Sequence, residues 1–478
     1  MQRSTKIVAT LGPASSEEAV LQRLVQAGID IVRLNFSHGT AADHAARVEL
    51  LRRIAAASGR TIGIMADLQG PKIRVGRFDG GKTELAVGDT FILDATCKLG
   101  NKERVGLDYP ELIDDVEAGT VLLLDDGRIV LDVQEVHAEQ VVTKVRCGGT
   151  LSDKKGINRQ GGGLTAPALT AKDRQDIRTA ADLKVDFVAV SFPKTGDDMR
   201  QARKLLSRAG SDALLIAKIE RAEAIDALEE IIEASDGIMV ARGDLAVEVG
   251  DAAVPALQKK MIRLAREKNR LTITATQMME SMITSPVPTR AEVSDVANAV
   301  LDGTDAVMLS AETASGKYPV ETVEAMARVC LEAEKSAEVT MDREFLDRIF
   351  TRIDQSIAMA AIWTAHHLKV KAIAALTQSG STALWMSRLN SGVPIYALTP
   401  EVRTRYKMAM YRDVFPLLMK QKHVDRDRLL WEAEQLLIDQ GVVKTGDLIV
   451  LTIGEPIGAI GGTNTLKIVE VGQSVKPK

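Results

Sequence analysis

The sequence predicts an α/β protein built on a (β/α)₈ barrel, with a small β domain inserted into it and a second α/β domain after it. Eight short apolar runs with the pattern of buried strands lie within residues 5–310, and helix-length segments separate most of them. Apolar strands that alternate with helices indicate a parallel sheet covered on both faces. Eight such units favour a closed barrel over a six-stranded open sheet with extra strands. The runs are TKIVATL, IDIVRLNF, TIGIMADL, VDFVAVSF, ALLIAKIE, DGIMVARG, LTITATQ and DAVMLS.

The alternation is interrupted between Gly70 and about Pro167. Segments such as GDTFILDA and QVVTKVRC are rich in β-branched residues and turns, which predicts a small β-barrel inserted after the third strand. After about Lys335 the runs KAIAALTQ, VPIYALTP and DLIVLTIG indicate the second α/β domain. We therefore expect three domains: a barrel domain of residues 1–70 and 168–335, an inserted domain of residues 71–167, and a C-terminal domain of residues 336–478.

Composition excludes several classes of protein. The chain has 478 residues and a net charge of -4 without a long basic run, which argues against nucleic-acid binding. Cys97, Cys147 and Cys330 are too far apart for a zinc site or a disulfide framework, and we expect a reducing cytoplasm. We also expect neither a signal peptide nor a membrane span, because no apolar stretch is long enough.

Polar residues gather at the carboxyl ends of the predicted barrel strands, which is the face where barrel enzymes carry their active sites. They are Arg33, Asn35, Ser37, Asp67, Lys218, Glu220, Arg242, Gly243, Asp244, Thr276, Gln277, Ser310 and Glu312.

Lys218 and Glu220 are two residues apart on one strand, so their side chains point to the same face. Burying both in an apolar run is costly unless they pair or act on a ligand, and a structural ion pair stays open as the alternative. Glu220 and Asp244 together could hold one hard divalent cation such as Mg²⁺. Two cationic side chains and two carboxylates at one rim are typical of a phosphoryl-transfer site.

Seven segments resemble the motifs of pyruvate kinases and occur in that family's order. They are TKIVATLGPAS, RLNFSHG, DLQGPKIRVG, AKIERAEAI, MVARGDLAVE, TATQMMESM and AVMLSAETASGKYP. The resemblance implies an enzyme of glycolysis that transfers the phosphoryl group of phosphoenolpyruvate to ADP, giving pyruvate and ATP. It also implies Mg²⁺ or Mn²⁺ as the divalent cofactor, and a homotetramer.

The resemblance also assigns roles to residues. Lys218 would stabilise the phosphoryl group during transfer, Arg33 would bind the phosphate of the substrate, and Glu220 and Asp244 would hold the metal. Gly243, Asp244 and Thr276 would border the carboxylate and enolate, with Thr276 a candidate for protonating the enolate through water. The residues on the nucleotide side would be Asn35, Ser37, His38, Arg74 and, from the insert, Lys155. The insert would then be a lid that excludes water.

Two departures from the family pattern affect the interpretation. The insert reads KGINRQGGG where the family usually has KGVNLPG, so Lys155 is kept but a triple glycine follows. The N-terminal extension of the animal members is absent, which indicates a bacterial member.

The loop after the third strand predicts independence from K⁺. In K⁺-dependent members a glutamate stands at the position of Lys72, and threonine and lysine stand at those of Leu68 and Gln69. The monovalent ion of those members lies near residues matching Asn35, Ser37 and Asp67. A lysine ammonium carries the same charge as K⁺, so Lys72 near Asp67 would replace the ion. The alternative is a surface lysine without a role.

The segment TQSGST in the second α/β domain leaves a predicted strand and precedes a predicted helix. Hydroxyls and N–H groups at such a turn suit a phosphate, although an ordinary helix N-cap would look the same. The resemblance implies a phosphorylated activator here, so we expect a sugar phosphate or AMP to bind through Thr377, Ser379, Ser381 and Thr382.

Two other functions remain open at this stage. One is a metal-dependent lyase acting on phosphoenolpyruvate or pyruvate, which would need the metal carboxylates but neither a lid with a nucleotide lysine nor Lys218 beside the metal. The other is a catalytically silent binding protein, which should have lost Lys218 or a metal carboxylate. Lys218 and both predicted metal carboxylates are present in this chain.

Overall fold

The computed structural model describes residues 2–336, 349–389, 391–420, 425–458 and 461–473. Eight parallel strands close into a barrel in the order β1-β16-β15-β14-β13-β12-β3-β2, which confirms the predicted barrel and excludes the open sheet. Each strand lies within one of the eight predicted runs. Their bounds are β1 (Lys6–Thr10), β2 (Ile31–Asn35), β3 (Gly63–Asp67), β12 (Phe187–Val190), β13 (Leu214–Ile219), β14 (Gly237–Ala241), β15 (Leu271–Ala275) and β16 (Ala306–Leu309).

Helices cover the outside of the barrel and bury their apolar faces against the strands. Three of them begin at a capping box in which the hydroxyl of Thr40, Thr170 or Thr289 accepts a hydrogen bond from the N–H three residues later, which fixes where each helix begins. The helices are α1 (Glu18–Ala27), α2 (Ala41–Ala57), α3 (Ala171–Asp182), α4 (Gly196–Arg208), α5 (Glu223–Asp226), α6 (Leu228–Ala234), α7 (Arg242–Val249), α8 (Val254–Glu267), α9 (Arg290–Leu301), α10 (Ala311–Ala314) and α11 (Pro319–Ser336).

The insert between β3 and α3 consists mainly of strands, as predicted, with one short 3₁₀ helix at Pro110–Ile113, but the strands form two sheets and not the single closed β-barrel that was expected. Its strands form a two-stranded sheet, β10-β4, and a six-stranded sheet, β11-β7-β8-β9-β5-β6. The sheets enclose one apolar core that includes Phe91, Leu122 and Leu131. The strands are β4 (Lys82–Leu85), β5 (Thr90–Asp94), β6 (Arg104–Val105), β7 (Val121–Leu124), β8 (Ile129–His137), β9 (Gln140–Cys147), β10 (Gly149–Ser152) and β11 (Ile157–Arg159).

The second α/β domain has a five-stranded sheet in the order β19-β18-β17-β20-β21. The predicted strands correspond to β17, β18 and β20, whereas the two edge strands were not predicted. β19 contains Pro416, which argues against a central strand but is tolerated at an edge, and β21 is a largely polar antiparallel strand. The elements are α13 (Ile353–Leu368), β17 (Ala372–Leu376), α14 (Ser381–Ser387), β18 (Ile395–Thr399), α15 (Val402–Met408), β19 (Val414–Leu418), α16 (Arg426–Asp439), β20 (Leu448–Gly454) and β21 (Thr463–Glu470).

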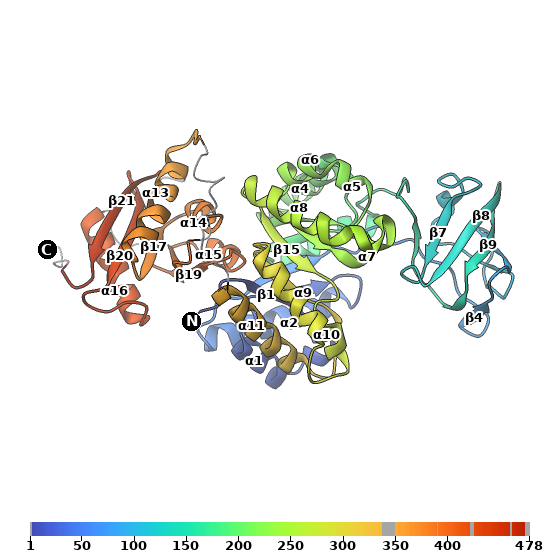
Figure 1. Cartoon of the computed structure of the whole chain (residues 1–478), viewed down its shortest axis with the longest axis horizontal. Helices are drawn as coiled ribbons and strands as arrows, with labels where there is room; N and C mark the ends of the chain where they lie inside the picture. The colour runs from blue at the N-terminus through green and yellow to red at the C-terminus, as the bar shows by residue number, and fades with distance from the viewer. Residues whose placement is uncertain (1, 337–348, 390, 421–424, 459–460, 474–478) are drawn as a thin grey trace.

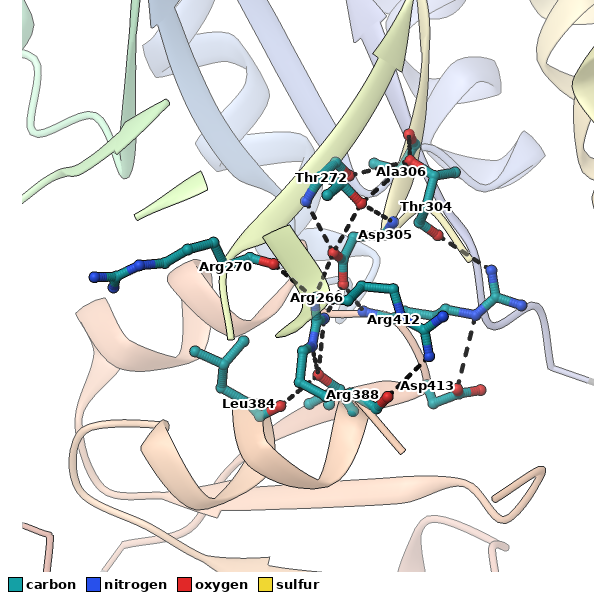
Figure 2. A network of polar contacts seen from close by, with 12 residues as sticks. Arg266, Arg270, Thr272, Thr304, Asp305, Ala306, Leu384, Arg388, Arg412 and Asp413 are labelled. Carbon is teal, nitrogen blue, oxygen red and sulfur yellow. Dashed lines mark hydrogen bonds and ion pairs between the residues drawn. The ribbon is translucent and has the colours of Figure 1, made fainter. Parts of the chain in front are cut away.

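The insert and the second α/β domain lie at opposite ends of the molecule, with the barrel between them (Figure 1). The second domain contacts the amino ends of the barrel strands: Lys6 Nζ at the start of β1 donates to Val414 O at 2.7 Å. Arg388, which follows α14, is paired with Asp305 at the start of β16 (Figure 2). The insert follows the carboxyl end of β3, so it lies at the end of the barrel where the predicted site residues gather.

The limits of the three domains remain a proposal. β3 ends at Asp67 and α3 begins at Ala171, so the crossings into and out of the insert fit limits near residues 70 and 168. The third limit, at residues 335/336, coincides with the end of α11 and precedes residues 337–348, which lie outside the described part.

Candidate active site

Lys218 lies at the end of β13 with its ammonium group among three oxygen acceptors. Its Nζ is 2.8 Å from Glu220 Oε1, 2.8 Å from Ser191 Oγ and 3.4 Å from Asp67 Oδ1. Burial works to lower the pKa of Lys218, but the carboxylates of Asp67 and Glu220 raise it above its ordinary value. The lysine is therefore a fixed cation, and its contact with Glu220 confirms that the two side chains share a face.

Glu220 is a buried carboxylate in contact with two different donors. Besides Lys218 on Oε1, its Oε2 accepts a hydrogen bond from Phe192 N at 2.9 Å. Burial raises the pKa of Glu220 to about 7; Lys218 opposes the shift and the Asp244 carboxylate adds to it. Asp244 therefore acts electrostatically on Glu220, and the prediction that the two carboxylates share one cation remains a prediction.

Asp67 at the end of β3 joins Lys218 to Arg33. Arg33 Nε donates to Asp67 Oδ2 at 2.5 Å, and its Nη1 donates to Thr10 Oγ1 at 3.2 Å. Burial works to raise the pKa of Asp67, but Arg33 and Lys218 lower it below its ordinary value. The guanidinium of Arg33 is thereby held in place at the carboxyl end of β2.

Gly243 and Thr276 are joined at the ends of neighbouring strands. Gly243 N donates to Thr276 Oγ1 at 2.8 Å. Thr276 and Gln277 both have positive φ, 69° and 52°, which costs of order 1–3 kcal/mol for each such residue. Arg242 fixes this turn, because its guanidinium donates to Thr276 O at 2.7 Å and to Asp295 Oδ1 at 2.7 Å.

Asn35, Ser37 and His38 form the turn that follows β2. Asn35 Oδ1 accepts from Ser37 N at 3.0 Å, and Asn35 O accepts from His38 N at 3.2 Å. His38 is exposed. The structure thus places the turn at the same rim as Arg33.

Lys72 does not lie where the sequence analysis predicted. Its ion pair is with Asp244, at 3.9 Å from Nζ to Oδ1, whereas Asp67 is paired with Arg33 and Lys218. The expectation that Lys72 neutralises Asp67 is therefore wrong. The reason is that the chain turns away from β3 at Gly70, where φ is 67°, and Lys72 then faces the start of α7.

Arg74 and Lys155 make their contacts inside the insert. Arg74 Nη1 donates to Lys154 O at 3.0 Å, and Lys155 Nζ lies 2.7 Å from Asp125 Oδ1. The structure therefore does not bring these two side chains into the Lys218 cluster. Figure 1 shows the insert at one end of the molecule, beside the barrel.

The sequence analysis missed Ser191, which contacts Lys218 directly. Ser191 Oγ also donates to Leu68 O at 2.7 Å. It follows β12 at the same rim as the other site residues, so its position at the end of a predicted strand was a signal. Of the rim residues that were named, Glu312 is buried and accepts from Ser310 N at 2.7 Å, which indicates a structural role.

Thr377, Ser379, Ser381 and Thr382 line an open pocket in the second α/β domain. Thr377 Oγ1 accepts from Gly380 N at 2.9 Å. Thr382 is buried, with its hydroxyl 2.7 Å from that of Thr463, whereas the hydroxyls of Ser379 and Ser381 lie 3.1 Å apart in an exposed position. The two serines are thus the more accessible hydroxyls.

Within the described ranges no group of three or more His, Cys, Asp or Glu residues is arranged to hold a metal. A metal at this site would thus depend on two protein carboxylates, Glu220 and Asp244, with the remaining oxygens supplied by other ligands, which suits Mg²⁺. None of the helices in the described part of the chain is long and apolar enough to cross a membrane.

The chain was compared with known proteins. A family model described as pyruvate kinase, barrel domain, matches residues 2–323, and one described as pyruvate kinase, alpha/beta domain, matches residues 355–469. Pyruvate kinase II of Salmonella typhimurium is 53% identical over 475 residues, with 98% of this chain and 99% of the relative covered. A pyruvate kinase of Haemophilus influenzae is 52% identical, with 95% and 96% covered. A crystal structure of a pyruvate kinase from Cryptosporidium parvum superimposes with a TM-score of 0.93 at 34% identity, covering 98% of this chain and 96% of that one.

Proposed function

The chain belongs to the pyruvate kinase family, of bacterial type, and we propose that its catalytic centre is the cluster that Lys218, Glu220 and Asp67 form with Arg33. The enzyme transfers the phosphoryl group of phosphoenolpyruvate to ADP, giving pyruvate and ATP. The observation that carries the location of the centre is the Lys218 ammonium held between two buried carboxylates. A coupled assay of pyruvate formation tests the activity: formation must depend on ADP, whereas a lyase would not need it and a silent binding protein would form none.

In the proposed centre each side chain acts on one part of the substrate. The Lys218 ammonium contacts the phosphoryl group during transfer, where it neutralises developing charge. The Arg33 guanidinium, fixed by Asp67, binds the phosphate oxygens. The backbone at Gly243 and the Thr276 hydroxyl border the carboxylate and the enolate. The strained turn at Thr276 supports this role, because such strain is often found at functional sites.

Glu220 and Asp244 are the proposed ligands of the divalent cation. They offer the oxygen donors that Mg²⁺ and Mn²⁺ accept, and a cation between them would remove the repulsion that helps raise the pKa of Glu220. When bound, the cation neutralises charge on the phosphate oxygens. Lys218 holds one oxygen of Glu220 and Phe192 N the other, which orients the carboxylate.

The nucleotide side is proposed to consist of Asn35, Ser37 and His38 on the barrel and Arg74 and Lys155 on the insert. The two insert residues contact other insert residues, so the insert would act as a lid that brings them to the barrel when nucleotide binds. Closure would exclude water from the transfer step.

We propose that the enzyme does not require K⁺. The tethered ammonium of Lys72 beside Asp244 supplies fixed positive charge at the metal side of the site, and Asp67 already has two cationic partners. The enzyme should reach its full turnover rate with Mg²⁺ and no K⁺. Tetramethylammonium should set the ionic strength, so that screening is the same in all assays. Lys72→Glu should lose activity and recover part of it with K⁺.

The control for charge reversal is Lys82→Glu, on an exposed strand of the insert, which should neither lower turnover nor create a response to K⁺. A rise in wild-type turnover of tenfold or more with K⁺, equal to about 1.4 kcal/mol in the barrier, would show that Lys72 does not replace the ion.

The pocket at Ser379 and Ser381 is the proposed site of a phosphorylated activator, a sugar phosphate or AMP. It lies on the domain at the amino ends of the barrel strands, so an activator there must shift an equilibrium between two states of the enzyme. Isothermal titration with a panel of these ligands should find one that binds, and Ser381→Asp should abolish that binding by placing a carboxylate against the phosphate.

Ser356→Asp is the matched control, because Ser356 is exposed on α13 of the same domain outside the pocket. Binding that survives Ser381→Asp, or no binding by any member of the panel, would rule out the site.

We further propose that the enzyme is a homotetramer and that it acts in the cytoplasm. Light scattering measures the number of subunits.

A further inference from the structure

The chain returns from the insert to the barrel through three glycines, of which Gly161 and Gly163 donate backbone hydrogen bonds to barrel residues. Gly161, Gly162 and Gly163 have φ of 80°, 79° and 92°. Gly163 N donates to the Glu223 carboxylate, and a side chain at Gly162 would meet Glu223 Oε2 at 2.5 Å. The return crossing is therefore fitted against the loop after β13, the strand that carries Lys218.

Glu248 on the barrel also contacts this return crossing. Gly161 N donates to Glu248 O at 3.1 Å, and Asn158 at β11 of the insert lines a small pocket together with Glu248. Glu248 is 5% exposed, and its Oε2 also accepts from Ala222 N at 2.8 Å. Glu248 thus contacts both the return crossing from the insert and a barrel loop.

The two segments that Glu248 joins to the insert are those that carry the proposed metal ligands. Ala222 comes two residues after Glu220. Glu248 itself follows Asp244 by four residues on α7, so the two side chains lie on the same face of the helix, one turn apart. A small pocket lined in part by Lys72, Asn158, Asp244 and Glu248 lies between insert and barrel.

We propose that Glu248 is a positioning residue that couples the insert to the metal carboxylates: Asn158 orients Glu248, which in turn sets the loop of Glu220 and the first turn of α7. The inference rests on the proposed role of Glu220 and Asp244. Partners one step removed from a metal orient its ligands, and their loss typically weakens metal binding about 10–100-fold. A change on the insert would therefore alter metal affinity on the barrel.

Mn²⁺ binding to the full-length enzyme, titrated by electron paramagnetic resonance without substrates, tests this coupling. Asn158→Ala removes the insert-side partner and leaves the Ala222 contact. Glu248→Gln keeps the size and an oxygen for Ala222 N but removes the charge. Each should raise the Kd for Mn²⁺ about tenfold, and the double variant should be no weaker than the single variants, because both act through one contact.

Glu434→Gln is the control, because Glu434 is a buried glutamate that likewise accepts from a backbone N–H, that of Gly472, in the second α/β domain; it should leave the Kd unchanged. If Glu248→Gln fails to fold, Asn158→Ala still gives the answer. An unchanged Kd in Asn158→Ala, or additive effects in the double variant, would overturn the coupling. Mn²⁺ binding that survives Glu220→Gln would instead overturn the proposed metal site.

Discussion

Replacing Lys218 with methionine should lower turnover by about three orders of magnitude or more, equal to about 4 kcal/mol in the barrier, with only a modest change in the KM for phosphoenolpyruvate. Methionine has a similar length but no charge. The ammonium contributes most when charge develops on the phosphoryl group, so its loss should affect kcat rather than substrate binding. Steady-state kinetics of ADP-dependent pyruvate formation measures both parameters.

Lys6→Met is the matched control for losing a buried lysine from a barrel strand. Lys6 is 3% exposed and bonded to Val414 O at the opposite end of the barrel, so turnover should stay within about threefold of wild type. Circular dichroism of both variants establishes that they are folded. A folded Lys218→Met enzyme with near-normal turnover would remove Lys218 from the mechanism.

Much of the barrel and of the candidate site could be predicted because the signals are local. A strand buried on both faces has a continuous apolar sequence. A spacing of two residues places the side chains of Lys218 and Glu220 on the same face of their strand. Because barrel sites lie at the carboxyl ends of the strands, residues from distant parts of the chain could be predicted to lie close together. Ser191 satisfied the same rule, but a serine at the end of a strand is too common to be distinctive.

The partner of Lys72 could not be predicted, because it depends on the direction in which the chain leaves β3. Positive φ at Gly70 and the packing of that residue against Ser191 set this direction. Neither feature can be predicted from the amino-acid composition of the loop. The positions of Arg74 and Lys155 depend in a similar way on where the insert lies relative to the barrel. Local sequence patterns do not determine that arrangement.

The contact between the barrel and the second α/β domain was also missed, although it is built from charged residues. Arg388 and Asp305 are 83 positions apart, and although Asp305 opens the predicted run DAVMLS, nothing in that run indicates its partner. Arg388 Nη1 donates to Asp305 Oδ2 at 2.9 Å and to Arg270 O at 2.8 Å, and Nη2 donates to Asp305 Oδ1 (Figure 2). Asp305 also accepts from Arg412 N at 3.1 Å and from Thr272 N at 2.9 Å.

Arg388→Met should reduce the free energy of unfolding by about 3–5 kcal/mol, which is typical when one partner of a buried ion pair is removed. The side chains of Arg388 and Asp305 are 2% and 0% exposed, so the remaining carboxylate would be buried without its counter-charge. Urea unfolding followed by circular dichroism measures the loss. Asp305→Asn in the same chain should restore part of it, because the amide oxygen still accepts from Thr272 N and no charge is left buried.

Arg403→Met separates this effect from the general loss of a contact between the domains. Arg403 pairs with Asp212 of the barrel, but the two side chains are 40% and 59% exposed, and such surface pairs contribute about 0–1 kcal/mol. If both arginine variants lose the same small amount, the buried pair is not what holds the domains together. If Arg388→Met alone is strongly destabilised and Asp305→Asn rescues it, the loss of stability comes from the buried carboxylate left without its counter-charge.

Arg388→Met should also weaken the response to activator. The reason is that α14 begins at Ser381 in the proposed activator pocket and is followed directly by Arg388, so the helix would lose the contact that fixes its end to the barrel.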